Sequence, residues 1–131
     1  MRPGRLLMFI VALSFASASH SLFAHHAEVA EYDSTKPVKV SGTLSKFEWS
    51  NPHVWFYVDV KGDDGKITTW GFSTQPPGAL MRRGVNKSAL KIGEVVNVEG
   101  VRARDGSNNA AMRSLTFADG KQVLVAEGGA K

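Results

Sequence analysis

Apolar and polar side chains alternate with a period of two along much of the chain, and this pattern constrains the fold more than any other feature. Successive side chains of a β-strand point to opposite faces, so alternation predicts strands with one face in a core and the other in solvent. The stretch HVWFYVDV, residues 53–60, is the clearest case. The side chains predicted to point inward there are Val54, Phe56, Val58 and Val60.

The first predicted strand covers residues 38–44 and is followed by a change of parity. Val38, Val40 and Leu44 share one face, whereas Phe47 and Trp49 fall on the opposite parity. A β-bulge, which inserts one extra residue into a strand, produces such a switch and bends the strand. Bends of this kind are common where a sheet curls into a barrel.

Turn signals divide the remaining chain into short elements. Asp-Gly in residues 62–66 predicts a hairpin between the second and third strands. Pro76 and Pro77 precede one or two helical turns that end at Gly84. Further strands are predicted over residues 94–104, 110–117 and 122–126. Five or six strands with one short helical insert after the third predict an all-β fold, a small closed OB-like barrel. A different small β-barrel or sandwich with the same number of strands is the alternative.

The N-terminal residues have the pattern of an export signal. Arg2 and Arg5 precede the apolar run LLMFIVAL, residues 6–13, and small residues follow it. The run is much shorter than the roughly 20 apolar residues of a membrane-spanning helix. We expect cleavage after Ala24, with Ala18 as the competing site, and export to the periplasm with no membrane span after cleavage. An N-terminal membrane anchor is the alternative.

Cleavage after Ala24 leaves 107 of the 131 residues, which is about the length of one domain. The predicted division of the chain is a signal peptide over residues 1–24, an N-terminal tail over 25–36, the barrel domain over 37–126 and a loose C-terminus over 127–131. No second domain fits into this length.

Charge and cysteine content exclude several classes of protein. Without Arg2 and Arg5, fourteen basic side chains face twelve acidic ones, a net charge of +2. The charges are interspersed, so nucleic acid is not an expected partner. The chain has no cysteine. This excludes a disulfide framework, a thiolate metal site and a cysteine nucleophile.

Several short motifs are spread along the predicted mature chain. They are His25-His26, Tyr32-Asp33, Gly42-Thr43-Leu44, WSNPH over residues 49–53, LMRRG over 80–84, LKIGEVVNVEG over 90–100 and ARDGSNNA over 103–110. Together they resemble the motifs of a family of small exported bacterial proteins of unknown function. The resemblance covers nearly the whole predicted mature chain and implies a periplasmic β-barrel domain, but it implies no activity.

The histidines are candidate metal ligands. His25, His26 and His53 remain after removal of the signal, and neutral imidazole suits copper or zinc. An N-terminal His25 would offer its α-amine and its ring nitrogen together, and His53 follows a proline at the start of a strand. The simpler interpretation is that His25 and His26 are solvated residues of a tail, because the strong zinc spacings are absent.

Aromatic residues are dense on the second and third predicted strands, where OB-folds bind their ligands. The candidate ligand-binding surface consists of Trp55, Tyr57, Trp70, Arg82 and Arg83. The simpler interpretation is that these rings fill the ends of a twisted barrel.

Motifs of catalysis are absent from the sequence, including the serine nucleophile elbow, a paired-carboxylate signature and the phosphate-binding loop. We therefore expect a periplasmic, non-enzymatic binding or interaction module, whose partner is a small ligand, a metal or another periplasmic protein. A copper or zinc carrier that uses the histidines is the alternative.

Overall fold

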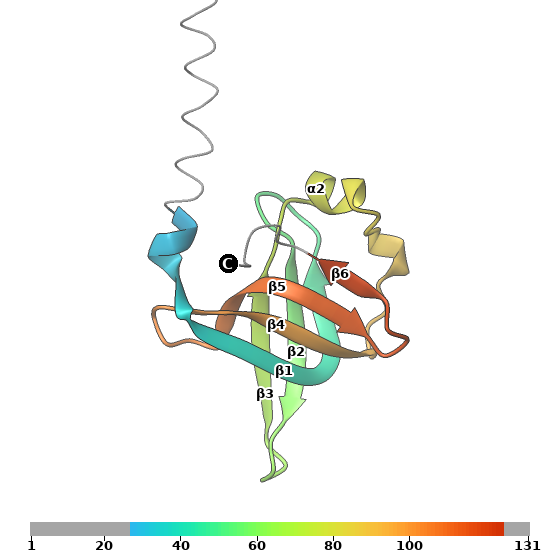
Figure 1. Ribbon diagram of the computed structural model, residues 1–131. Coiled ribbons are helices and arrows are strands. Elements are labelled where there is room, and N and C mark those ends of the chain that lie inside the picture. Colours follow the sequence, from blue (N-terminus) through green and yellow to red (C-terminus); the bar gives the residue numbers. More distant parts are fainter. Residues whose placement is uncertain (1–26, 125–131) are drawn as a thin grey trace, which may run out of the picture. The chain divides into compact units, whose positions relative to one another are not determined.

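The computed structural model describes residues 27–124, and Figure 1 shows the arrangement of its elements. Two units are distinguished, one ending at Glu31 and one beginning at Tyr32. In the first unit, residues 27–31 are helical. The second unit contains the sheet and the short helices that follow.

The strands are β1 (Tyr32–Glu48), β2 (Trp55–Lys61), β3 (Ile67–Ser73), β4 (Val95–Ala103), β5 (Asn109–Phe117) and β6 (Gln122–Leu124). Between β3 and β4 lie the helix α2 (Pro77–Arg82) and the short 3-10 helix η1 (Lys87–Ala89). The predicted helical insert after the third strand is therefore confirmed.

All six strands form one sheet with a nearly closed order. Neighbours in the order β3-β2-β1-β4-β5-β6 are paired antiparallel, and β3 also pairs with β5 in parallel. The additional pairing closes the first five strands into a ring, through the residue pairs Gly71↔Asn109, Phe72↔Ala110 and Ser73↔Ala111. This confirms the predicted all-β, OB-like, barrel-like class.

The first strand is longer than predicted and bends within its length. It begins at Tyr32, inside the segment that the sequence pattern assigns to the N-terminal tail, because Tyr32 pairs with Ala103 of β4, and the regular pairing with β4 resumes at Pro37 after an irregularity. Its pairing with β2 shifts register between Leu44 and Lys46. This irregularity is the bulge that the change of parity predicts, and it lies just beyond Thr43, the last residue of β1 that pairs with β4.

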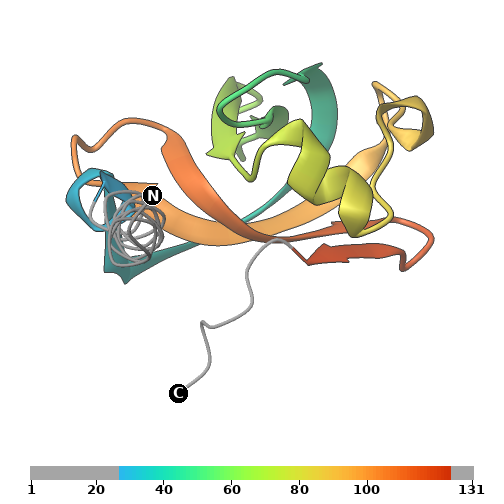
Figure 2. The same cartoon turned by 90° about the horizontal axis from the view of Figure 1, so that it is seen from above.

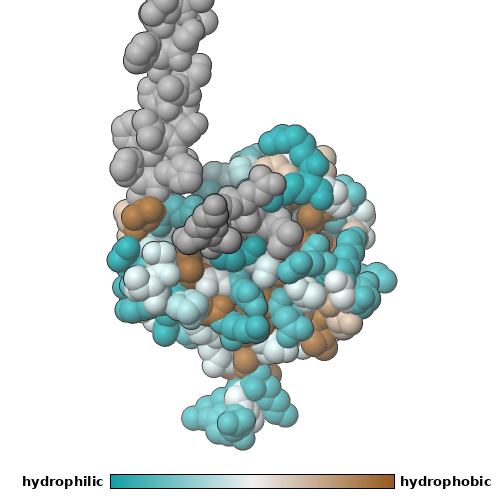
Figure 3. All heavy atoms as spheres, in the orientation of Figure 1, coloured by the Kyte–Doolittle hydropathy of each residue, from teal (hydrophilic) through white to brown (hydrophobic). Residues whose placement is uncertain are grey.

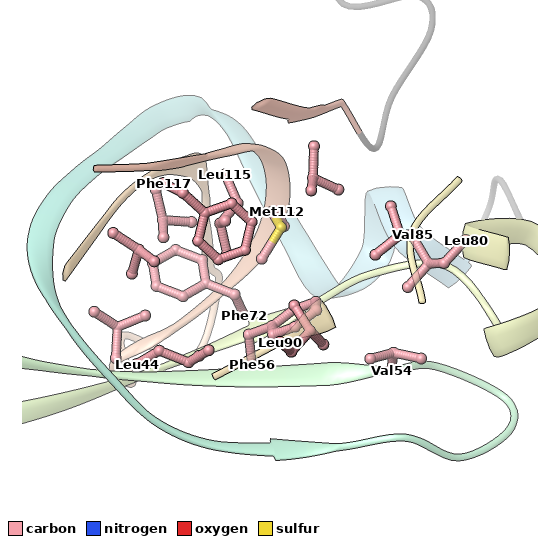
Figure 4. Packing of buried hydrophobic residues seen from close by; sticks show 14 of the residues in the cluster. Leu44, Val54, Phe56, Phe72, Leu80, Val85, Leu90, Met112, Leu115 and Phe117 are labelled. Atoms are coloured by element: carbon pink, nitrogen blue, oxygen red, sulfur yellow. The ribbon is translucent and has the colours of Figure 1, made fainter. Parts of the chain in front are cut away.

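The core lies inside the ring and is formed by side chains that alternate along the strands (Figure 4). Phe56 and Phe72 are opposite each other on β2 and β3 and are almost fully buried. Val54 and Val58 are also fully buried, and Val60 is packed against the core. The inward face predicted for the second strand is thus confirmed. From α2, Leu80 enters the same core, so the helix covers one end of the ring (Figure 2).

Two glycines allow strands to approach each other at close range. A Cβ atom on Gly42 would lie 2.3 Å from the carbonyl oxygen of Asp59 in β2. A Cβ on Gly100 would lie 2.4 Å from the carbonyl oxygen of Ala111 in β5. Because both clashes are with backbone atoms, no side-chain rotation relieves them. The tight curvature of the sheet therefore depends on glycine at these positions.

A second, smaller cluster fixes the start of β1 on the outside of the sheet. Tyr32 packs there with three buried residues of β4 and β5, which are Val101, Ala103 and Ala111.

The residue that follows Tyr32 is a hydrogen-bonded aspartate. Asp33 Oδ1 accepts hydrogen bonds from the backbone nitrogen of Thr35 at 3.0 Å and from its hydroxyl at 2.7 Å. These bonds are the main reason why the pKa of Asp33 is below its usual range.

The outer surface in the view of Figure 3 is mostly hydrophilic. The hairpin between β2 and β3 projects from the body of the sheet, and its tip is polar. Gly65 has a φ of 79° in this turn, as expected for an Asp-Gly turn, and the backbone nitrogen of Gly62 donates to the carbonyl oxygen of Lys66 at 2.8 Å.

Candidate functional site

Two aromatic rings stand side by side on the outward face of β2. Trp55 and Tyr57 have the parity opposite to the buried Phe56 and Val58, so they point away from the core and stay partly exposed. Their ring centroids are 6.3 Å apart and their planes differ by 20°. These two residues are called the aromatic pair below.

The backbone of β3 forms the floor beneath the aromatic pair. Gly71 lies opposite Tyr57 in the pairing of β2 with β3. A Cβ atom on Gly71 would lie 3.4 Å from Tyr57 Cε1, 3.5 Å from Trp55 Cζ3 and 2.5 Å from Asn109 Oδ1. The missing side chain therefore lets Asn109 of β5 reach this spot, next to both rings.

On the other side of the pair, the bulge in β1 places a lysine and a glutamate beside the rings. Lys46 is opposite Tyr57, and Glu48 is opposite Trp55, so all four side chains share one face. The ammonium of Lys46 lies 5.1 Å from the centroid of the Tyr57 ring and forms an ion pair with Glu48. Such a cation over a ring is attracted by its π-electrons.

Three pKa values reflect these contacts. The hydrogen bond between Lys46 and Glu48 raises the pKa of the lysine and lowers that of the glutamate. Partial burial, reinforced by the negative charge of Glu48, raises the pKa of the Tyr57 phenol. The Tyr57 hydroxyl therefore stays protonated and donates to Glu48 Oε2, with 3.4 Å between the oxygens.

A carboxylate held by two hydroxyl groups lies further along the same face of β2. Asp59 Oδ1 accepts from Thr69 Oγ1 at 2.6 Å and from Ser45 Oγ at 3.2 Å. Ser45 is the residue between the register positions Leu44 and Lys46, so the bulge also supplies this contact. The region defined by the aromatic pair with Lys46, Glu48, Asp59, Gly71 and Asn109 is called the aromatic face below.

The structure separates Trp70 from the aromatic pair, although the sequence groups them in one surface. Trp70 is opposite Val58, an inward residue, so it points to the inner side of the sheet. Its ring lies 6.3 Å from that of Phe72, and Arg102 Cζ lies 5.4 Å from its centroid. Trp70 packs against the core, which agrees with the simpler interpretation that some of these rings fill an end of the barrel.

The two arginines of the predicted surface are also on a different element. Arg82 is the last residue of α2, and Arg83 is its C-terminal cap; both are exposed. Because α2 inserts Leu80 into the core at an end of the ring, the arginines stand on the cap of the ring and not on the outward face of β2.

Of the three predicted metal ligands, His25 and His26 lie outside the described residues. His53 is exposed, and its Nδ1 is 2.7 Å from the carbonyl oxygen of Thr74. A carbonyl can only accept, so Nδ1 is the donor in this contact, and in the neutral ring Nε2 is then the nitrogen that carries the lone pair. Within residues 27–124, no group of three or more His, Cys, Asp or Glu side chains is placed to hold a metal ion.

A depression that the sequence reasoning did not identify lies between η1 and the turn that joins β5 to β6. Its volume is about 170 Å³, and its walls combine apolar residues with charged ones. The sequence pattern predicts only that the apolar residues around it are buried. It cannot predict the depression, because its two sides come from residues 85–94 and 117–123, which are far apart along the chain. The lining residues are Val85, Asn86, Ala89, Leu90, Lys91, Glu94, Phe117, Asp119, Lys121 and Val123.

Among the described helices, none has the length and apolar character needed to cross a lipid bilayer.

Comparison with known proteins gives a family but no activity. Residues 12–112 match the model of a family of unknown function, DUF6152. No curated protein and no solved structure matches the chain. The matched stretch includes every residue of the aromatic face, and it agrees with the resemblance to an uncharacterised family that the sequence motifs indicate. The chain therefore belongs to DUF6152, a family of unknown function.

Proposed function

We propose that the protein is an exported, periplasmic, non-enzymatic binding module and that its ligand lies on the aromatic face. The observation that carries this proposal is the aromatic pair itself, which lies beside Gly71 and is bordered by the ion pair of Lys46 and Glu48. Large rings contribute most to stability when they are buried, and partly exposed rings with polar neighbours are enriched in binding surfaces.

The order of the site also supports binding. The two rings are stacked on each other, and the neighbouring polar side chains are bonded to one another, as in the contact of Tyr57 with Glu48 and of Asp59 with Thr69. A surface ordered before the ligand arrives loses less conformational entropy on binding.

The binding proposal is tested by fragment screening with NMR, which needs no knowledge of the ligand. Small cyclic and planar fragments are added to the 15N-labelled protein, and the amides whose signals shift are mapped. We expect the shifts to gather at the aromatic face and to be lost in Trp55→Ala. The control is Met81→Ala, because Met81 is an exposed apolar residue of α2. Fragments that gather instead at the depression near Phe117, or that bind Trp55→Ala as well as the wild type, would exclude the aromatic face.

The periplasmic location rests on Arg2 and Arg5, the apolar run over residues 6–13 and the small residues up to Ala24. The intact mass of the exported protein is expected to correspond to residues 25–131, since this is the form that cleavage after Ala24 leaves. A full-length chain recovered from the cytoplasm would contradict both the signal and the location.

Binding of copper or zinc is the second candidate function, and one contact favours it. The hydrogen bond from His53 Nδ1 to Thr74 is the kind of second contact that fixes the tautomer of metal-binding histidines. In this second proposal, Nε2 of His53 and the imidazoles of His25 and His26 supply the ligands.

Calorimetric titration with copper tests the metal proposal on the wild type, on His53→Ala and on the double variant His25→Ala/His26→Ala. Binding is expected to weaken in both variants and, in the wild type, as pH falls through about 6.5, where free imidazole takes up a proton. A form with one extra alanine before His25 separates chelation by the amine from binding by the rings alone. Equal copper affinity in all forms would exclude this function.

A further inference from the structure

The groups around the aromatic pair indicate what class of ligand it takes. Two carboxylates, Glu48 and Asp59, lie on the aromatic face, and the lysine that lies over Tyr57 is already bonded to Glu48. A phosphate backbone binds through cations that are available to neutralise it. The charges beside the pair therefore favour a neutral ligand over a strand of nucleic acid.

The polar atoms on this face match hydroxyl groups. A hydroxyl donates one hydrogen bond and accepts others, so it needs both kinds of neighbour. The carboxylates of Glu48 and Asp59 accept, the ammonium of Lys46 donates, and the amide of Asn109 does both. A Cβ atom on Gly71 would lie 2.5 Å from Asn109 Oδ1 and 3.4 Å from Tyr57 Cε1, so the Asn109 amide is next to the aromatic pair.

The rings match the other surface of a sugar. A pyranose carries its C–H groups on a flat, weakly apolar face and its hydroxyl groups around the rim, so it can stack on an aromatic ring and hydrogen-bond at its edge. Oligosaccharides are among the ligands that OB-folds bind on the surface of their second and third strands. Trp55 and Tyr57 follow each other along one strand with ring planes that differ by only 20° and centroids 6.3 Å apart, so one glycan chain can contact both rings.

We infer that the ligand is a neutral glycan, with pyranose rings stacked on Trp55 and Tyr57 and hydroxyl groups bonded to Glu48, Lys46 and Asn109. This inference rests on the proposed function, since it names the ligand class of the same site. Because a glycan of two or more sugars can contact both rings and a single sugar only one, the longer glycan should bind at least about tenfold more tightly.

Isothermal titration tests the inference with three probes: a neutral cello-oligosaccharide, a neutral chito-oligosaccharide and single-stranded oligo-dT. We expect at least one of the two glycans to bind, Trp55→Ala to weaken that binding about tenfold or more and Met81→Ala to leave it unchanged. Trp55→Phe keeps a ring on β2 and should retain part of the affinity, which controls for misfolding of the alanine variant.

A second variant separates a neutral ligand from an anionic one. Glu48→Gln keeps the shape of the side chain but removes the charge that holds Lys46. A neutral glycan should change in affinity by less than about threefold, whereas oligo-dT should bind more tightly once the lysine is released.

The outcomes distinguish this inference from the proposed function. Fragments that bind the aromatic face together with glycans that depend on Trp55 support both. Fragments that bind there without any glycan binding, or with oligo-dT as the preferred probe, overturn the glycan and leave the binding module intact. Fragments and glycans that both avoid the aromatic face overturn the two proposals together.

Discussion

Replacing glycine by alanine at two positions should change the stability of this protein in opposite directions. At Gly100 the new Cβ would lie 2.4 Å from the carbonyl oxygen of Ala111, although real Cβ atoms essentially never come within 3.0 Å of such an atom. Strands β4 and β5 must therefore separate by at least 0.6 Å, the difference between these two distances. The contact is with backbone, so the strain falls on the ladder that pairs the two strands.

The magnitude follows from comparable substitutions. Adding a methyl group to a packed interior destabilises by about 1–3 kcal/mol, and we expect the upper end for Gly100→Ala because no side chain can move aside. Gly78 is in α2, and the nearest atom to its added Cβ is the end of the flexible Arg82 side chain at 3.5 Å. Gly78→Ala should therefore stabilise the protein by about 0.5–1 kcal/mol, the usual advantage of alanine over glycine in a helix.

Urea unfolding followed by tryptophan fluorescence measures both effects in one assay. The midpoint should fall for Gly100→Ala and rise slightly for Gly78→Ala, with equal slopes if the unfolded states are alike. In a thermal melt, a loss of about 3 kcal/mol corresponds to a fall of roughly 12 °C or more for a domain of this size. If Gly100→Ala unfolds at the wild-type midpoint, the close approach of β4 and β5 is wrong.

Three further changes test other parts of the structure. Phe56→Ala should destabilise by about 3–5 kcal/mol in urea unfolding, because it empties a buried site, whereas Lys61→Ala should change stability by less than about 0.5 kcal/mol; equal effects would show an incorrect strand register. Because Asp33 has a lowered pKa in the folded state, the unfolded chain binds more protons below about pH 4, and the contribution of Asp33 to stability is lost as pH falls there. Asp33→Asn should flatten this part of the stability profile in a series of acid melts, and an unchanged profile would contradict the contacts of Asp33 with Thr35. Gly71→Ala should displace the end of the Asn109 side chain, because Oδ1 lies 2.5 Å from the new Cβ, whereas the two rings come only into ordinary contact with it. Fragment binding by NMR should therefore weaken while stability changes by about 1 kcal/mol or less; unchanged binding would show that Asn109 takes no part in the site.

Local pattern predicted much of the fold because each prediction depended on neighbours in sequence. The alternation of Val54, Phe56 and Val58 placed the inner face of β2, and the parity change after Leu44 predicted the bulge that now appears in the register of β1. The Asp-Gly turn at Gly65 and the helical insert before Gly84 have equally local signals.

Features that depend on contacts between residues far apart in the sequence could not be predicted from local patterns. The face of Trp70 could be assigned only through its partner Val58 on β2. The early start of β1 at Tyr32 depends on contact with Val101 and Ala103 of β4. The depression beside η1 joins residues from two distant parts of the chain, so no window of sequence contains it.

Only the part of the candidate site that is local in sequence could be predicted. Trp55 and Tyr57 were identified from alternation and aromatic density, since they are close in sequence. Lys46, Gly71 and Asn109 complete the aromatic face from three other strands, and only the register of those strands shows that they meet there.

The ring of strands is closed by a short parallel pairing between β3 and β5, so this pairing can break while the antiparallel pairings of the sheet persist. Gly71 and Asn109 are joined across it although 38 positions separate them in the chain, so closure must overcome the entropy of a large loop with only three residue pairs. If this pairing breaks, every strand keeps an antiparallel neighbour in the order β3-β2-β1-β4-β5-β6. The aromatic pair lies next to this pairing, because Gly71 belongs to β3 and Asn109 to β5. A ligand that contacts both β3 and β5 would hold the two strands together. The backbone nitrogen of Gly71 donates to the carbonyl oxygen of Asn108, so hydrogen exchange of the Gly71 amide should slow when the ligand is bound.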